Sequence, residues 1–147
     1  MSRSAESATI AEGRATTRVR YPETDRMGVA HHSHYLAWFE IGRTELMREA
    51  GCPYGELEDD GIFFPVIRVE AVYRSPARYD EIVMVSTRLV AVGGATVRFE
   101  YTITRDTDGT VLATGASEHA AVDRRGRPRR LPAMVRQKLM GVREKRS

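Results

Sequence analysis

The sequence predicts an α+β fold in which one antiparallel sheet of five or six strands wraps around a single long helix. Three observations predict this fold. Apolar residues recur at helical spacing in one long segment, residues 33–50. One strand-like segment precedes that helix, and four strand-like segments follow it without a helical pattern between them. Strands joined by short turns pair antiparallel, so the helix has one sheet against which to pack.

The first strand is expected at residues 16–21, where the side chains alternate with arginines and Pro22 ends the pattern. Residues 1–14 are rich in Ser, Ala and Glu, and we expect them to be a flexible lead-in. The predicted domain therefore covers residues 15–132, and residues 133–147 are expected to be a C-terminal helix followed by a basic tail.

The long helix is expected at residues 33–50, with Ser33 as its N-cap and Gly51 as its C-terminal stop. Glu40 lies on the polar face. The residues that share the opposite, packed face are Tyr35, Trp38, Phe39, Gly42, Leu46 and Ala50. A glycine in the middle of that face lowers helix propensity, so Gly42 predicts that the helix approaches its neighbour closely there.

The four later strands are rich in β-branched residues or alternate in polarity, and they occupy residues 63–73, 82–92, 96–105 and 110–122. Gly93-Gly94 separates the second of these strands from the third, and Asp108-Gly109 is typical of the hairpin turn that follows. A breaker containing glycine and proline comes next, and a short helix is expected from about Ala133.

Composition predicts one ordinary globular domain, with 41% hydrophobic and 29% charged residues. No apolar run reaches the length of a membrane span, and the N-terminus has no hydrophobic signal core. The single cysteine, Cys52, excludes an internal disulfide and is typical of a reducing compartment. We therefore expect a cytoplasmic protein that does not insert stably into a membrane.

Much of the net charge of +3 comes from arginines in residues 124–130 and 136–146. A basic edge of this kind attracts nucleic acid, an anionic membrane or a phosphorylated small molecule. A solvated charged tail accounts for it equally well.

The most informative segment, residues 21–40, places an acidic residue, Asp25, between a strand and the long helix. A glycine turn at Gly28 and three histidines separate this acid from the aromatic start of the helix. Backbone N–H groups at a helix N-terminus lack partners within the helix and polarise a carbonyl group placed near them. A carboxylate beside such a terminus predicts an acyl-transfer site.

The same segment carries the motif Tyr-x-Glu-Thr-Asp-x-x-Gly-Val-x-His-His-x-x-Tyr-x-x-Trp-Phe-Glu-x-x-Arg-x-Glu, from Tyr21 to Glu45. This motif resembles the 4-hydroxybenzoyl-CoA thioesterase-like hotdog family, in particular its branch of small acyl-CoA thioesterases associated with Tol-Pal. Shorter matches follow at Phe64-Pro65, between Tyr73 and Asp80, and between Arg127 and Pro132. The resemblance implies a hotdog fold, hydrolysis of acyl-CoA to free acid and coenzyme A, no separate cofactor, and homodimers or homotetramers with the site at the dimer interface.

By this resemblance, Asp25 is the catalytic carboxylate, acting as nucleophile or as general base toward water. The backbone N–H of His32 is expected to polarise the thioester carbonyl. The residues expected to bind the substrate are Gly28, His31, Tyr35, Phe64, Arg74 and Arg78. Some relatives hold the coenzyme's phosphates with basic residues in the hairpin that is Gly93-Gly94 here. That role is therefore expected to fall to other arginines, with Arg88 and Arg124 as alternatives to Arg74 and Arg78.

Other carboxylates compete with this assignment. Asp25 would have a structural role if it capped the turn or the helix. Glu40 is the alternative acid, because other hotdog branches place their carboxylate on the helix, although the helical wheel turns it away from the packed face. Glu23 is expected to orient Asp25.

Metal binding and cysteine catalysis receive little support. The adjacent histidines His31 and His32 are expected to point apart, and His34 completes no tetrahedral set with Cys, Asp or Glu. His119, on an apolar strand, is expected to be a hydrogen-bonded core residue. Cys52 follows a helix C-terminus, where the helix dipole opposes thiolate formation.

Three functions follow, in descending order of support. The first is an acyl-CoA thioesterase, and the bulk of Tyr35, Trp38, Phe63 and Phe64 favours short or medium acyl groups. The second is a non-catalytic hotdog module that binds acyl-CoA or acyl carrier protein. The third, from the basic segments, is an adaptor for nucleic acid or a membrane surface, although nucleic acid is not the expected partner.

Overall fold

The computed structural model of this protein describes residues 9–146, with side chains described as far as residue 141. The first eight residues of the predicted lead-in and the charged side chains of the predicted tail beyond residue 141 lie outside that description.

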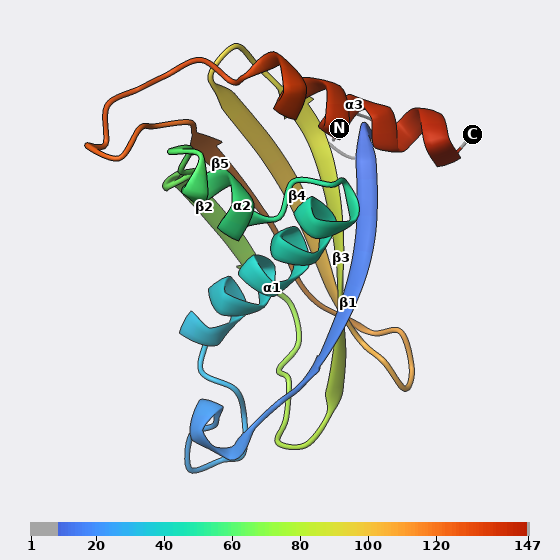
Figure 1. Ribbon diagram of the computed structural model, residues 1–147. Helices are drawn as coiled ribbons and strands as arrows, with labels where there is room; N and C mark the ends of the chain where they lie inside the picture. The colour runs from blue at the N-terminus through green and yellow to red at the C-terminus, as the bar shows by residue number, and fades with distance from the viewer. Residues whose placement is uncertain (1–8, 147) are drawn as a thin grey trace.

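One five-stranded antiparallel sheet curves around the long helix α1, Ser33–Glu49, as Figure 1 shows. The strands follow the order β1-β3-β4-β5-β2, so β1 and β2 are the two edges of the sheet. Their bounds are β1 Ala11–Arg18, β2 Val66–Tyr73, β3 Ile82–Val92, β4 Thr96–Arg105 and β5 Val111–Ala120. The predicted α+β fold, with an antiparallel sheet wrapped around one helix, is confirmed.

The core lies between α1 and the concave face of the sheet. The predicted packed face of α1 is buried throughout, together with Met47. The Phe39 ring stacks on the Tyr101 ring of β4, with centroids 4.3 Å apart. Along β3 and β4, inward apolar side chains alternate with outward polar ones. This alternation fixes which strand residues face α1.

Two glycines allow α1 to approach the sheet closely. A Cβ at Gly42 would lie 2.7 Å from the Val85 side chain and would overlap the Thr87 hydroxyl. A Cβ at Gly115 of β5 would lie 2.5 Å from the Phe39 ring. The close approach predicted from Gly42 is therefore present.

The edge elements differ from the prediction. β1 begins at Ala11 rather than Thr16, so residues 11–14 belong to the sheet instead of to a flexible lead-in. Ala11 pairs with Leu89 of β3, and this pairing orders a segment that has little strand propensity of its own. Tyr21–Glu23, predicted in part as strand, forms a 3-10 helix with Pro22 in its first turn.

The helix ends also need correction. His32, rather than Ser33, is the N-cap of α1, and Ser33 is the first helical residue. A short helix α2, Tyr54–Asp59, was absent from the prediction. The C-terminal helix α3, Ala133–Arg146, begins where predicted and lies across the end of the sheet, with Val135 and Leu139 buried (Figure 1). No helix in the described part of the chain is both long and apolar enough to span a membrane.

Candidate active site

Asp25 occupies a tight turn between the 3-10 helix and α1. Its Oδ1 atom accepts hydrogen bonds from the backbone N–H of Met27 at 2.8 Å and of Val29 at 3.2 Å. Gly28 has φ +76°, a conformation that closes this turn and that residues with a Cβ rarely adopt. One carboxylate oxygen of Asp25 therefore holds the turn, as the structural alternative predicted. The side chain is exposed, and Oδ2 makes no hydrogen bond with a described residue.

The start of α1 provides a backbone donor. Ser33 N–H donates to His31 Nδ1, and His34 N–H donates to the His31 carbonyl. The His32 N–H, by contrast, makes no hydrogen bond within residues 9–146. It therefore remains available to a ligand.

A cavity of about 290 Å³ lies beside this helix start. It is lined by Val29, Ala30, His32, Tyr35, Tyr73, Arg74, Ser75 and Pro76. The Tyr73 hydroxyl donates to the His32 carbonyl at 3.4 Å, and Tyr35 Oη accepts from Ala77 N–H at 3.1 Å. Burial raises the pKa of Tyr35, so its hydroxyl stays protonated. The cavity thus contains apolar walls, hydroxyl groups and one arginine.

Asp25 and His32 line two neighbouring cavities rather than one. Asp25 and Gly28 belong to a second cavity of about 380 Å³, together with Tyr21, Thr24, Arg26 and Tyr79. Val29, which accepts a hydrogen bond from Asp25 N–H, lines the His32 cavity and connects the two. Of the predicted substrate-binding residues, one chain places Tyr35 and Arg74 beside His32, and Gly28 beside Asp25.

Three predicted substrate-binding residues lie outside both cavities. The His31 ring packs on His32, and the Arg78 backbone bridges to Val29. Phe64 lies just before β2, about 30 Å along that strand from Tyr73 at roughly 3.3 Å per residue. Within one chain, Phe64 therefore packs beside Tyr54 and lies far from the start of α1.

Sequence reasoning missed Tyr73 as a residue of the site. Its position was part of the family motif, but nothing in the local pattern showed that the end of β2 meets the start of α1.

The two alternative acids have other environments. Glu23 is buried and accepts from Arg20 N–H at 2.7 Å, so it does not orient Asp25, and that prediction is wrong. The reason is local, because Glu23 closes its own 3-10 turn by binding the backbone three residues earlier. Glu40 is exposed on α1, as the helical wheel predicted, and lies in neither cavity.

The histidines partly contradict the prediction. The His31 and His32 rings lie 4.2 Å apart and tilted by 31°, so they pack together instead of pointing apart. His31 is held in this position by its contact with the Ser33 hydroxyl at 2.9 Å. Among the residues whose side chains are described, no group of three His, Cys, Asp or Glu is placed to hold a metal ion.

His119 is a hydrogen-bonded core residue, as predicted. It is fully buried, and its ring contacts the Ser117 hydroxyl at 2.8 Å and the Phe64 carbonyl at 3.1 Å. Cys52 is also buried, and burial raises the pKa of its thiol, which opposes a nucleophilic role.

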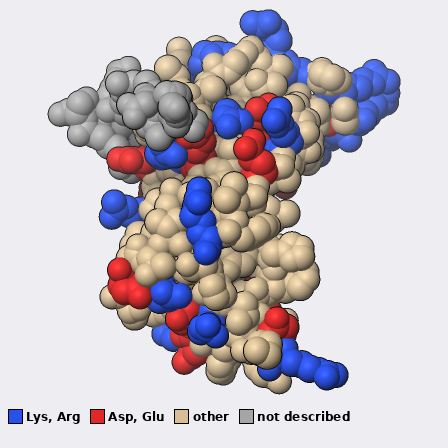
Figure 2. Space-filling view, turned by 180° about the vertical axis from the view of Figure 1, so that it is seen from behind, with Lys and Arg blue, Asp and Glu red and all other residues tan. Residues whose placement is uncertain are grey.

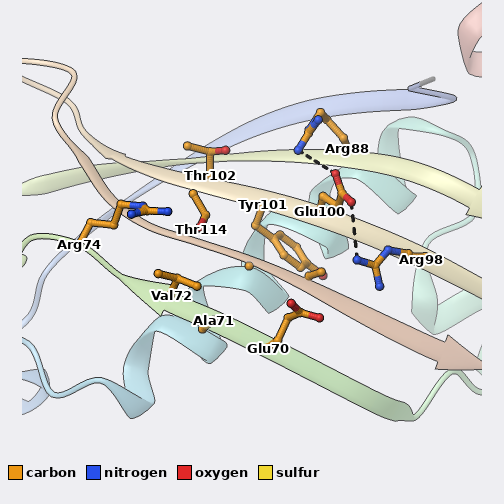
Figure 3. A pocket seen from close by; sticks show the side chains of 12 residues that line it. Glu70, Ala71, Val72, Arg74, Arg88, Arg98, Glu100, Tyr101, Thr102 and Thr114 are labelled. Atoms are coloured by element: carbon orange, nitrogen blue, oxygen red, sulfur yellow. Dashed lines mark hydrogen bonds and ion pairs between the residues drawn. The ribbon is translucent and has the colours of Figure 1, made fainter. Parts of the chain in front are cut away.

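The arginines proposed for phosphate binding fall into two groups. Arg88 lies on the convex face of the sheet and pairs with Glu100 at 3.0 Å, and Arg98 pairs with the same carboxylate, as the dashed lines in Figure 3 show. Arg74 makes no ion pair with a described residue, and it lines both the His32 cavity and a cavity of about 370 Å³ on the convex face that Arg88 and Arg98 also line. Arg74 is therefore better placed than Arg88 to contact a ligand at the helix start.

The loop of residues 124–130 forms a separate basic surface, seen as the blue group at the upper right of Figure 2. Asp123 shapes this loop by accepting from the backbone N–H of Arg125 and Arg127 at 2.9 and 3.0 Å. These bonds hold the pKa of Asp123 below its ordinary value. Arg124 bonds the Asp59 carbonyl, which fixes the loop against the end of α2.

Comparison with known proteins agrees with this fold. The sequence model of the Thioesterase-like superfamily matches residues 19–139. The acyl-CoA thioesterase YbgC of Haemophilus influenzae is 36% identical over 107 residues, which are 72% of this chain and 77% of the relative. The acyl-CoA thioester hydrolase YbgC of Escherichia coli is 29% identical over 119 residues, or 80% of this chain and 88% of the relative.

Solved structures show the same similarity. A hypothetical protein of Thermus thermophilus, TT1821, has a TM-score of 0.83 at 37% identity, covering 89% of this chain and 97% of that one. The DHNA-CoA thioesterase of Staphylococcus aureus has a TM-score of 0.82 at 26% identity, covering 92% and 95%. The chain therefore belongs to the Thioesterase-like superfamily of hotdog-fold proteins, as the motif from Tyr21 to Glu45 predicted.

Proposed function

We propose that this protein is an acyl-CoA thioesterase whose reaction takes place at the start of α1. The observation that carries the proposal is the His32 N–H at the helix N-terminus, which has no partner within residues 9–146 and lies beside a cavity of about 290 Å³, seven residues after Asp25. The relatives named as acyl-CoA thioesterases support the same reaction.

The chemistry divides between these two groups. The His32 N–H, together with the positive end of the helix dipole, stabilises the negative charge that develops on the thioester oxygen. The Asp25 carboxylate then has two possible roles. It attacks the carbonyl carbon and expels the thiolate of coenzyme A, leaving an anhydride that water hydrolyses, or it removes a proton from the attacking water. Both routes give the free acid and coenzyme A.

A second copy of the chain is part of the proposal. Strand β2 is an edge whose apolar side chains are exposed, including Ile67 at 55% and Val72 at 48%. Such an edge is open to pairing with another strand. Two-fold pairing of β2 with β2 runs antiparallel, and if centred near Val69 it brings Phe64 of one copy near Tyr73 of the other. This arrangement would give Phe64 its predicted place in the substrate pocket.

Coenzyme A is the only non-protein group proposed, as part of the substrate. Its phosphates are expected to lie against Arg74 of one copy and the loop of residues 124–130 of the other, because within one chain the Phe63–Val122 bridge places that loop at the opposite end of β2. The single cysteine supports the cytoplasm as the compartment.

The test is hydrolysis of a panel of acyl-CoAs of different lengths, followed with a dye that traps the released thiol. We expect turnover of short or medium acyl groups. If the folded protein hydrolyses none of them, the alternative of a non-catalytic module that binds acyl-CoA or acyl carrier protein replaces this proposal. A sharp optimum at long chains would contradict the expected small pocket.

A further inference from the structure

Another cavity lies between α1 and β2, further along α1 than the His32 cavity. Its volume is about 380 Å³. It is lined by Leu36, Ala37, Phe39, Glu40, Arg43, Val66, Val69 and Ser117. The walls are mostly apolar, and the first residue of α1 that lines the cavity, Leu36, lies about one helical turn after His32. An acyl group held at His32 and extended along α1 would enter it.

Arg43 is the unusual residue of this cavity. The half-buried arginines of the sheet each pair with a carboxylate, Arg88 and Arg98 with Glu100 and Arg105 with Glu81, whereas Arg129 and Arg136 bond backbone carbonyls. Arg43 is also half-buried and its hydrogen bonds go to the neutral Tyr54 and Tyr101 hydroxyls, yet it makes no ion pair with any residue whose side chain is described. A partly buried guanidinium without an anion is unfavourable, and a carboxylate is the group that best matches its fork of donors.

The charge of Arg43 acts on the groups around it. Burial raises the pKa of Tyr54 and of Tyr101, and the nearby Arg43 guanidinium opposes both increases. For His119, burial lowers the pKa to about 4, and Arg43 contributes to that decrease. The positive potential of Arg43 therefore reaches the buried Tyr101 and His119 and the half-buried Tyr54, and at Tyr54 the Glu40 carboxylate acts against it.

The polar groups at the base of the cavity form hydrogen bonds with one another. Because the Phe64 carbonyl can only accept, His119 Nδ1 carries its proton and Nε2 accepts from the Ser117 hydroxyl. Ser117 in turn accepts from Tyr101, 2.6 Å away. The hydroxyl donors are thus used within the protein, and Arg43, which hydrogen-bonds the Tyr54 and Tyr101 hydroxyls, is the one cation among the lining residues.

We propose that this cavity binds the far end of a medium-length acyl group that ends in a carboxylate, and that Arg43 binds the carboxylate. The proposal rests on the proposed thioesterase function and specifies its substrate class as the CoA monothioester of a dicarboxylic acid. Side chains of a helix point back toward its N-terminus, so Arg43 covers the turn that contains Phe39, about 10 Å along the helix from His32 at about 1.5 Å per residue. An extended chain advances roughly 1.2 Å per bond, so roughly eight bonds cover this distance.

Glu40 limits where a carboxylate can be bound. It lies on the exposed rim of the cavity, one turn before Arg43, and the two side chains do not form an ion pair. Within the cavity the Arg43 guanidinium attracts a ligand carboxylate, and the Glu40 carboxylate on the rim repels it. If Glu40 instead turned onto Arg43 in solution, the variant Glu40→Gln would increase binding of the dicarboxylic substrate.

The experiment compares octanedioyl-CoA with octanoyl-CoA, which have the same length and differ in the terminal carboxylate. The wild-type protein should show the higher kcat/KM with octanedioyl-CoA. Arg43→Met keeps the apolar stem and should lower that value by about 10-fold or more while leaving octanoyl-CoA within about 3-fold, as expected for loss of a charge-assisted hydrogen bond. Arg48→Met, an exposed arginine on the same helix, is the matched control and should change neither value.

Several outcomes would overturn the assignment. They are a wild-type preference for octanoyl-CoA, an equal loss with both substrates in Arg43→Met, or an equal effect of Arg48→Met. If Arg43→Met does not fold, Arg43→Lys keeps the charge without the fork and should retain part of the preference. If no thioester is hydrolysed, the proposed function fails, and the dissociation constants of the two non-hydrolysable thioether analogues still decide whether Arg43 binds a carboxylate.

Discussion

Asp25 combines a structural and a proposed chemical role in one carboxylate, and substitution can separate them. In Asp25→Asn, the amide oxygen can still accept from Met27 and Val29 N–H, so the turn and the melting temperature should be retained. The amide can neither attack a thioester nor accept a proton from water. We expect kcat to fall by about 10² to 10⁴-fold, the usual contribution of a positioned acid or base. The measurement is steady-state hydrolysis of the best acyl-CoA of the panel.

Glu40→Gln provides the comparison for Asp25→Asn. Glu40 is exposed and lies outside the His32 and Asp25 cavities, so its loss should leave kcat with a simple monocarboxylic acyl-CoA nearly unchanged. If Glu40→Gln abolished turnover and Asp25→Asn did not, the catalytic acid would be on the helix and the assignment of Asp25 would be wrong.

His119 should make stability depend on pH. Burial lowers its pKa from 6.5 to about 4, so between these values the unfolded chain binds a proton that the folded chain does not. The free energy of unfolding should therefore fall as the pH decreases through this window, by about 3 kcal/mol at most. Urea unfolding of wild type and His119→Gln at several pH values measures the difference. Parallel curves for the two proteins between pH 4 and 6.5 would contradict a buried neutral histidine.

At the scale of single residues, the sequence predicted only those features of the candidate site that depend on residues close by in the chain. The Asp25 turn and the helix start at His32 depend on neighbouring residues, and both are present. The partners of Glu23 and the packing of His31 depend on which backbone groups remain free after folding, and neither was predicted correctly. The place of Arg43 in a cavity was not predicted, because the strands that enclose this cavity are distant in sequence from α1.

At the scale of elements, the packing of α1 on β3 should tolerate no side chain at Gly42. A Cβ there would meet Val85 and Thr87, whose own positions are fixed by the sheet. We expect Gly42→Ala to lower the free energy of unfolding by roughly 1–3 kcal/mol, the usual cost of overpacking, despite the higher helix propensity of alanine.

Gly55→Ala is the matched control for Gly42→Ala. Gly55 is also helical, in α2, but a Cβ there would have no atom within 4 Å. Only the higher helix propensity of alanine then acts, so the free energy of unfolding should stay the same or rise slightly. Equal chemical denaturation midpoints for the two variants would show that close packing does not explain Gly42.

The central strands were predicted more accurately than the elements at the edges of the fold. The bounds of β3 and β4 agree with the prediction, because both strands alternate clearly in polarity and end at glycine or hairpin turns. The start of β1 and the helix α2 were missed, since each is short or polar and is ordered by its neighbours. No local pattern could show that Ala11 would pair with Leu89, so the edge of the sheet required the whole fold.

At the scale of the whole molecule, the exposed apolar edge β2 predicts self-association. Light scattering at micromolar concentration should give a mass of at least twice the 16.5 kDa of one chain. Ile67→Lys places a charge on this edge and should shift the protein toward the monomer. Met134→Lys, at an exposed apolar residue of α3, is the control and should not. A wild-type mass near 16.5 kDa would contradict the predicted dimer.

The distribution of charge over the molecule predicts how binding responds to salt. Coenzyme A carries its negative charge on phosphates, and the loop of residues 124–130 presents exposed arginines at one end of the domain (Figure 2). Screening between exposed charges grows as the Debye length falls from about 10 Å at 0.1 M salt to about 3 Å at 1 M. KM should therefore rise several-fold over this range, while kcat, set by the groups at the start of α1, changes little.

Substitution of Arg125 and Arg127 by Gln should raise KM at low salt and flatten its salt dependence, because the charges that attract the phosphates are then removed. Both side chains are exposed, and Asp123 bonds only their backbone N–H groups, so the loop itself should keep its shape. Arg18→Gln, at an exposed arginine that pairs with Asp80, is the control and should leave KM as in the wild type. A KM that does not vary with salt in the wild type would show that these arginines serve solubility rather than coenzyme binding.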